Sequence, residues 1–466
     1  MRSLPVLFGI LALVATQPAT AQIGFGGLGG FGSGIGTGIA GAASPTDTPQ
    51  FGFAPFVTVQ GFYSRIVGPT SLSFQNRQDS YGAFASAGIG GGKRWAHTAI
   101  ALGYVGNVTY NPYFYSGSRW LQNHSGYFSV SHAVTDRLSV FVSQIAGTAL
   151  GGSSSYYGLG SLGLLGGFGG LGGYDYSGAT SFLSPGNYLQ NGLVDSELVS
   201  QRVNYYASSG GLSYRMSERW FVSAGGGAAF VRREGSLFGG DSQQASGQIG
   251  YIINPSSEIG LSYSHFWNQV TGQFGGVEGQ ALNLGYSRRL SRRSYIGVGG
   301  GAVEVRSGFV GLVPVPEQIA LVTGQTAAFE VQKVHYYSAG FGGSYSQNFQ
   351  TSSLNIFANR GFSPGNGVVL AGVRDIVGIN YSMFQNRKVG LNASAVGTRY
   401  TSSLGGIQRS YTYAGTLSTG YRLFKQVEFT TSAGYQETQI PHLLHLRGLV
   451  VSAGLGWTPR EFVLAF

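Results

Sequence analysis

Apolar and polar side chains alternate along most of this 466-residue chain. The stretch 411–435 shows the unit, because two alternating segments flank a tight turn at 423–426. One face of the first segment carries Tyr411, Tyr413, Leu417 and Tyr421, and the other carries Thr412, Thr416, Ser418 and Arg422. This alternation predicts a β-strand with one apolar face that needs a cover. A second sheet covers that face in a soluble sandwich, whereas lipid covers it in a transmembrane barrel with a polar lumen.

The same pattern predicts about 18 strands, an even number, as in bacterial single-chain barrels. They are expected at 56–65, 80–91, 97–107, 124–134, 138–147, 203–215, 220–231, 243–253, 257–267, 277–289, 294–305, 334–346, 351–360, 373–384, 388–399, 411–422, 427–436 and 448–458. The connections between them alternate between a short and a long class. The longer class comprises 66–79, 108–123, 148–202, 306–333, 361–372, 400–410 and 437–447. Short periplasmic turns and long extracellular loops produce this order in a barrel, whereas a soluble sandwich has no reason to segregate its loops.

Aromatic residues lie beside both ends of the predicted strands. Two such rings are typical of the girdles at the two interfaces of a membrane-spanning barrel. Strand propensity explains the number of aromatic residues but not their placement. The predicted girdle includes Trp95, Trp220, Trp267, Tyr286, Tyr421 and Trp457.

The last strand alternates most regularly, with Leu449, Val451 and Trp457 on its apolar face. It resembles the C-terminal assembly signal of bacterial outer-membrane barrels, but the chain continues beyond Trp457 to a second aromatic end, Phe466. Either residue fits the recognised position. The resemblance is architectural, covers the chain from about Phe56 onward and matches no named porin family. It implies an all-β fold, a transmembrane antiparallel up-and-down β-barrel, and insertion into the cell outer membrane by the barrel assembly machinery.

Composition agrees with a membrane barrel. Charged residues make up only 10% of the chain, against about 25% in ordinary soluble domains. The 79 glycines and the 14% aromatic content accompany no long apolar helix. Because the chain has no cysteine, a disulfide framework, a thiolate metal site and a cysteine nucleophile are excluded.

The N-terminus has the pattern of a signal peptide, with Arg2, a short apolar stretch at 4–15 and a cleavage site between Ala21 and Gln22. We therefore expect a signal peptide at 1–21, a glycine-rich flexible extension at 22–55 and the barrel at 56–466. The long loop 148–202 contains an uncharged, glycine-rich segment at 158–173. That loop fits two interpretations, a constriction folded into the pore and an external cap, and the extension fits either a periplasmic lead-in or a plug.

The inferred lumen face is mostly Gly, Ser, Thr, Asn and Gln. At about 18 strands the interior is wide enough for an aqueous channel. The pore-lining candidates are Arg306, Glu304, Arg374, Asn392 and Glu428. A net charge of +10 favours anions in the pore, although arginines at a membrane boundary also contact lipid phosphates.

These features favour a porin-like channel for passive diffusion of small hydrophilic solutes. The alternatives are an export conduit for an anionic polysaccharide and a structural or adhesive barrel without transport. The seven histidines show no metal-ligand spacing, so we expect no metal, no cofactor and no enzyme activity. The expected partners are outer-membrane lipid, lipopolysaccharide, the assembly machinery and small solutes, but not nucleic acid. A homo-oligomer is left open.

Overall fold

The structure is a computed structural model. It describes residues 51–67, 77–110, 120–150, 202–233, 239–271, 276–324, 326–363, 372–385, 388–402, 409–441, 444–457 and 462–464. The cleavage-site residues Ala21 and Gln22, most of the loop 148–202 and the C-terminal Phe466 lie outside these ranges.

Eighteen long strands follow one another along the chain, and each contains most or all of one strand predicted from the sequence. They are β1 (Phe51–Val67), β2 (Arg77–Arg94), β3 (Thr98–Tyr110), β4 (Trp120–Ala133), β5 (Leu138–Leu150), β6 (Arg202–Arg215), β7 (Trp220–Arg233), β8 (Gly239–Asn254), β9 (Ser257–Thr271), β10 (Gly276–Arg289), β11 (Ser294–Pro314), β12 (Ala327–Asn348), β13 (Ser352–Ser363), β14 (Gly372–Gln385), β15 (Val389–Ser402), β16 (Arg409–Arg422), β17 (Val427–Ile440) and β18 (Leu444–Trp457). A short helix, α4 (Glu317–Thr323), and a three-residue strand, β19 (Phe462–Leu464), complete the described elements. No described helix is long and apolar enough to cross a membrane.

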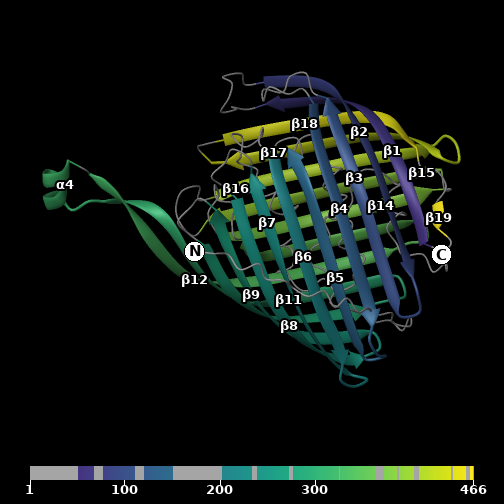
Figure 1. Cartoon of the computed structure of the whole chain (residues 1–466), viewed down its shortest axis with the longest axis horizontal. Coiled ribbons are helices and arrows are strands. Elements are labelled where there is room, and N and C mark those ends of the chain that lie inside the picture. Colours follow the sequence, from purple (N-terminus) through teal and green to yellow (C-terminus); the bar gives the residue numbers. More distant parts are fainter. Residues whose placement is uncertain are drawn as a thin grey trace.

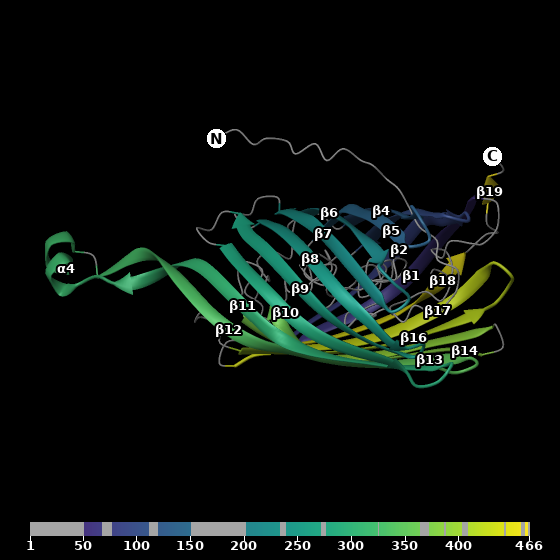
Figure 2. The same ribbon diagram turned by 90° about the horizontal axis from the view of Figure 1, so that it is seen from below.

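Each strand pairs antiparallel with its neighbour in sequence, and β1 also pairs with β18 from Val57↔Trp457 to Val67↔Arg447. The sheet therefore closes on itself into a cylinder whose strands are tilted, seen from two directions in Figures 1 and 2. The fold is a transmembrane antiparallel up-and-down β-barrel, as the alternation, the connection lengths and the closing strand together predicted. Closure removes the sheet edges, which would otherwise expose unpaired backbone groups to lipid.

The outward face of the barrel is strongly apolar. Large hydrophobic side chains are exposed on alternate positions, as with Val57, Val59 and Tyr63 on β1, while the residues between them are buried or partly buried. Such a band satisfies the requirement for contact with hydrocarbon.

The strands extend further than the sequence pattern predicted. β1 begins at Phe51, so residues 51–55, expected in the flexible extension, belong to a strand. The connection expected at 437–447 shrinks because β17 runs to Ile440 and β18 starts at Leu444. The difference in length between the two classes of connection is therefore smaller than predicted. At the C-terminal end, β18 closes the barrel, and β19 adds a second short pairing with Phe51–Phe53 of β1.

One hairpin extends beyond the barrel. β11 and β12 remain paired out to Pro314↔Ala327, and α4 lies at the tip of this arm on the left of Figure 1. The described pairing of β12 with β13 runs only from Phe341 to Asn348. On the other side, β11 stays paired with β10 as far as Ser307↔Val277. The arm therefore leaves the wall beyond Ser307, and the predicted loop 306–333 is largely β-structure.

Phenylalanine rings on the inner face lie over glycines of the neighbouring strand. The directly opposed pairs are Phe56 and Gly88, Phe62 and Gly82, Phe221 and Gly250, Phe266 and Gly279, and Phe357 and Gly378. All five rings are buried. A Cβ atom on Gly250 would lie only 2.1 Å from the Phe221 ring, so the ring occupies the space that a larger residue would need. The rings of these pairs therefore pack closely against the backbone of the neighbouring strand.

We predict that Gly250→Ala destabilises the barrel by about 1–3 kcal/mol, because the added methyl group overpacks the Phe221 ring. The measurement is the free energy of unfolding in urea, followed by tryptophan fluorescence. Gly308→Ala is the matched control, since a Cβ atom there would meet nothing within 4 Å. Equal stability of the two variants would contradict the packing role of the ring.

Candidate functional site

A hydrogen-bonded polar ladder crosses the closing seam on the inner face. The Gln60 amide nitrogen donates to the Thr430 hydroxyl at 3.1 Å, and the Ser452 hydroxyl donates to the Gln60 carbonyl at 3.0 Å. Ser452 also bonds to Ser432 at 2.7 Å. Gln60 comes from β1 and its partners from β17 and β18. The seam is thus held by side chains as well as by the backbone ladder.

Similar short polar pairs recur around the inner wall. Ser64 bonds to Ser80 at 2.7 Å, Ser143 to Ser209 at 2.6 Å, and Ser394 to Thr416 at 2.6 Å. Opposed hydroxyl pairs of this kind are the cross-strand contacts that stabilise sheets. Because these side chains are short, they leave space in the lumen and present groups that water can solvate.

Three of the five predicted pore-lining residues are on the inner face. Arg374 is opposite Tyr400 in register, and Tyr400 is buried. Asn392 accepts a hydrogen bond from the Ser382 hydroxyl, and Glu428 is opposite Arg422. Their contact with a water-filled pore stays a prediction.

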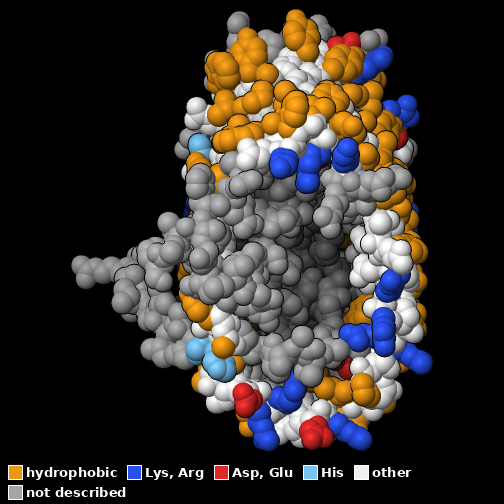
Figure 3. Space-filling view, turned by 90° about the vertical axis from the view of Figure 1, so that its right-hand side faces the viewer, with side chains coloured by type: hydrophobic (Ala, Val, Ile, Leu, Met, Phe, Trp, Pro, Cys, Tyr) orange, Lys and Arg blue, Asp and Glu red, His pale blue; other side chains and the backbone are white. Residues whose placement is uncertain are grey.

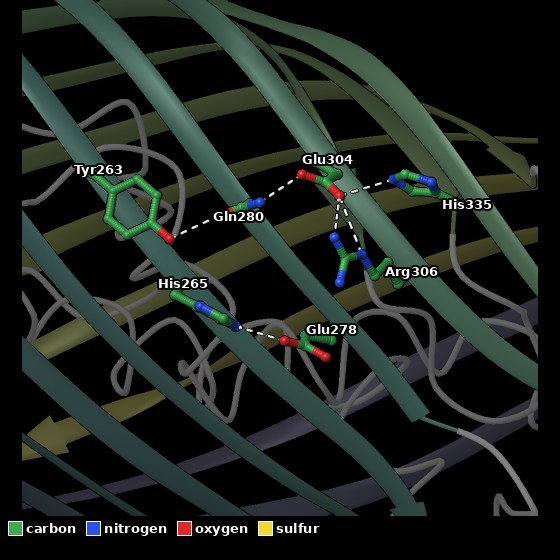
Figure 4. A network of polar contacts seen from close by, with 7 residues as sticks. All are labelled: Tyr263, His265, Glu278, Gln280, Glu304, Arg306 and His335. Carbon is green, nitrogen blue, oxygen red and sulfur yellow. Dashed lines mark hydrogen bonds and ion pairs between the residues drawn. The ribbon is translucent and has the colours of Figure 1, made fainter.

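Glu304 and Arg306 differ from the prediction, because the structure places both on the outer face. They share the face of Val298, which is exposed, whereas Val303 and Val305 are buried on the inner face against Phe266. Figure 4 shows Glu304 at the centre of a network on the outside of the wall. Glu304 accepts hydrogen bonds from the Gln280 amide at 2.5 Å and from the Arg306 guanidinium at 2.8 Å, and it bonds to His335 at 2.8 Å.

A carboxylate on the inner face also lies near the short-turn end. Glu258, at the start of β9, is buried and accepts a hydrogen bond from the Ser287 hydroxyl at 3.2 Å. Its position on an inward face agrees with the alternation of β9. The inward phenylalanines were not predicted, and only the glycines opposite them could have revealed their direction.

The mouth at the short-turn end is basic. Figure 3 shows lysine and arginine side chains gathered around this opening. Among the residues that the structure describes, the exposed acidic ones there are Asp136 and Glu218, and basic residues clearly outnumber them. The exposed basic residues are Arg137, Arg219, Arg288, Arg289, Arg292, Arg293, Lys388, Arg422 and Lys425.

The predicted girdle residues occupy the surface. Trp95, Trp220 and Tyr421 are exposed near the short turns, Trp457 is exposed at the end of β18, and Trp267 is exposed near the opposite rim. Tyr286 is partly exposed. Their contact with the membrane interface stays a prediction.

Comparison with known proteins gives structural matches only. No protein-family model and no curated protein sequence matches the chain. The outer membrane protein OpdK from Pseudomonas aeruginosa is similar with a TM-score of 0.43 and 9% identity, over 87% of this chain and 99% of that one. OccK9 (OpdG) from the same organism has a TM-score of 0.41 and 8% identity, over 87% and 98%. The ferric-catecholate import receptor Fiu from E. coli K12 has a TM-score of 0.41 and 7% identity, over 89% and 82%.

Adjacent residues on β17 test the assignment of the two faces. Since the chain has no cysteine, Glu428→Cys and Phe429→Cys each carry a single thiol. We predict that a charged, water-soluble thiosulfonate labels Glu428→Cys rapidly in liposomes. Phe429→Cys should react slowly, because Phe429 is exposed on the lipid face. Labelling rates followed by mass spectrometry check this, and faster reaction at position 429 would invert the assignment.

Proposed function

We propose that the protein is a channel of the bacterial outer membrane through which small hydrophilic solutes diffuse passively. The observation that carries the proposal is a closed 18-stranded wall with an apolar outer band and an inner face of Ser, Thr, Asn and Gln side chains. Water solvates such an inner face, and a barrel of this size encloses enough space for a solute path. The short turns face the periplasm, as in other barrels inserted from that side. Export after cleavage between Ala21 and Gln22 belongs to the same proposal.

The channel prefers anions. The basic ring at the short-turn mouth raises the local concentration of anions, because the charges lie at an opening with low-dielectric walls. Inside the barrel, Arg374 adds a positive charge, although Glu258 and Glu428 oppose it. The effect of the mouth is limited to about 8 Å at physiological ionic strength and fades as salt is added.

The basic mouth also favours a second candidate, an export conduit for an anionic polysaccharide. In this function the positive charge faces the compartment from which the polymer is supplied. The two candidates differ in their dependence on a periplasmic partner: a diffusion channel conducts alone in a planar bilayer, whereas an export conduit closed until its partner binds does not.

We predict that the purified protein conducts in planar bilayers and that its reversal potential in a potassium chloride gradient indicates anion preference. Arg292→Gln combined with Arg293→Gln should move the reversal potential toward cation preference, most strongly at low salt, because two positive charges leave the mouth. Arg65→Gln combined with Arg232→Gln is the control, as it removes two charges from the outward face at the opposite rim.

Three outcomes separate the functions. Unchanged selectivity in Arg292→Gln/Arg293→Gln, or an equal shift in the control, would reject the role of the mouth. Cation preference of the unmodified channel would reject anion selection altogether. Absence of any conductance from a correctly folded barrel would favour the export conduit or a structural barrel.

A further inference from the structure

The outward face near the long-loop rim carries a ring of paired charges. Six carboxylates in the described part of the barrel each contact arginine or histidine. We call this set the outer charge ring. Its members are Asp79 with Arg65, Asp241 with Arg232, Glu278 with His265, Glu304 with Arg306 and His335, Asp375 with Arg360 and Arg399, and Glu437 with His445 and Arg447. Figure 4 shows two of these groups side by side on the wall.

The ring follows directly on the apolar outer band. On β14, Asp375 shares its face with Val377 and Ile379, which are exposed. Charged side chains facing hydrocarbon are costly at the bilayer centre and become tolerable near the interface. The ring therefore lies at the level of the lipid headgroups, with acyl chains against the apolar residues beside it.

The Asp375 group carries a net positive charge. Arg399 approaches the carboxylate with Nε at 2.8 Å and Nη2 at 2.7 Å, and Arg360 donates from Nη1 at 3.1 Å. Two guanidinium groups thus share one carboxylate and leave a net positive charge. The Glu304 and Glu437 groups instead each combine one arginine with one histidine.

The two guanidiniums can take a further acceptor. Each guanidinium carries five N–H donors in a planar fork, and Asp375 engages only part of them. The Arg399 side chain is half exposed and that of Arg360 about a third. The Phe341 ring lies 6.0 Å from the Arg360 guanidinium, at the end of the β12–β13 pairing, and supports its position.

We propose that Arg360 and Arg399 bind a phosphate group in the headgroup of an outer-leaflet glycolipid. Guanidinium forks match the geometry of phosphate oxygens and form strong charge-assisted hydrogen bonds with them. Asp375 on β14 contacts both forks, and the phosphate binds the N–H donors that the carboxylate does not engage. The exposed Ile356, Val377 and Ile379 supply the apolar surface for the acyl chains of the same lipid. The charge of the site and its continuity with the lipid-facing band both select a membrane lipid as the occupant.

The test is a lipid titration of the full barrel purified in detergent, followed by native mass spectrometry. The probes are bis-phosphorylated lipid A, the same lipid without phosphates, and inorganic phosphate. The unmodified barrel should bind the phosphorylated lipid more tightly than the dephosphorylated one. Arg360→Gln/Arg399→Gln should lose about tenfold or more in affinity for the phosphorylated lipid, since charge-assisted hydrogen bonds disappear.

Two variants separate binding from strand stability. Asp375→Asn keeps both guanidiniums and should retain binding of phosphorylated lipid, although it breaks the same ion pairs as the double variant. Arg292→Gln/Arg293→Gln removes two charges at the other mouth and should bind as the unmodified barrel does. If the double arginine variant fails to fold, Arg399→Lys keeps the charge, loses the fork and should still lower the affinity.

Two results with variants would overturn the site: unchanged binding by the double arginine variant or by Arg399→Lys, and loss of binding in Asp375→Asn. Two results with the probes would do so as well. They are equal binding of the dephosphorylated lipid and displacement of the lipid by equimolar inorganic phosphate, which would indicate a free-phosphate site. The proposal rests on the outer-membrane placement of the barrel but not on conduction. Single-channel conductance of the double arginine variant should stay unchanged, so failure of the channel function and failure of the lipid site are distinguishable.

Discussion

The structure depends on one constraint, the pairing of every backbone amide and carbonyl group that faces hydrocarbon. Lipid offers no substitute partner, so a sheet in a membrane must close. The β1–β18 register from Val57↔Trp457 to Val67↔Arg447 provides this closure. Gln60 reinforces the seam through side-chain bonds to Thr430 and Ser452. Once the sheet is closed, strand alternation alone decides which side chains meet lipid and which meet the interior.

The interior uses two kinds of wall surface. Hydroxyl and amide side chains bond to one another across strands and keep the surface hydrophilic, whereas buried phenylalanine rings cover glycines on the adjacent strand. The second arrangement explains part of the high glycine content, because Gly250 and Gly279 leave the space that Phe221 and Phe266 fill. Covering a strand glycine with a neighbouring aromatic ring also fixes the register of the pair. An apolar residue on the inner face is therefore compatible with a polar lumen.

The sequence predicted the strands well and one strand's orientation poorly. Alternation located all eighteen long strands, since the lipid-facing residues of most strands are large and apolar. On β11 the positions before the rim are largely glycine, and they mark neither face clearly. The outer part of the strand then reads Val303, Glu304, Val305, Arg306, and the usual rule assigns valines to lipid. The structure has the opposite orientation, because the two valines pack against Phe266 on the inner face and the outward face carries the paired charges of Glu304 and Arg306. A single sequence does not show how deep in the membrane a residue lies. The outward direction of Glu304 and Arg306 could therefore not be predicted from the sequence.

Two independent features show where the apolar band ends toward the long-loop rim: the charged groups on the outward face and the end of the backbone pairing between strands. Asp375, with Arg360 and Arg399, lies where the apolar band of β13–β15 ends. The described pairing of β12 with β13 stops at Phe341↔Arg360, at the same level. Beyond that level β11 stays paired with β10 as far as Ser307↔Val277, and only past Ser307 do β11 and β12 continue as a two-stranded arm (Figure 2). A two-stranded ribbon leaves backbone groups on its edges for water, which lipid would not allow. The arm can therefore leave the wall only above the hydrocarbon. Arg306 and Glu278 of the outer charge ring lie at its base, which supports the headgroup level proposed for the ring.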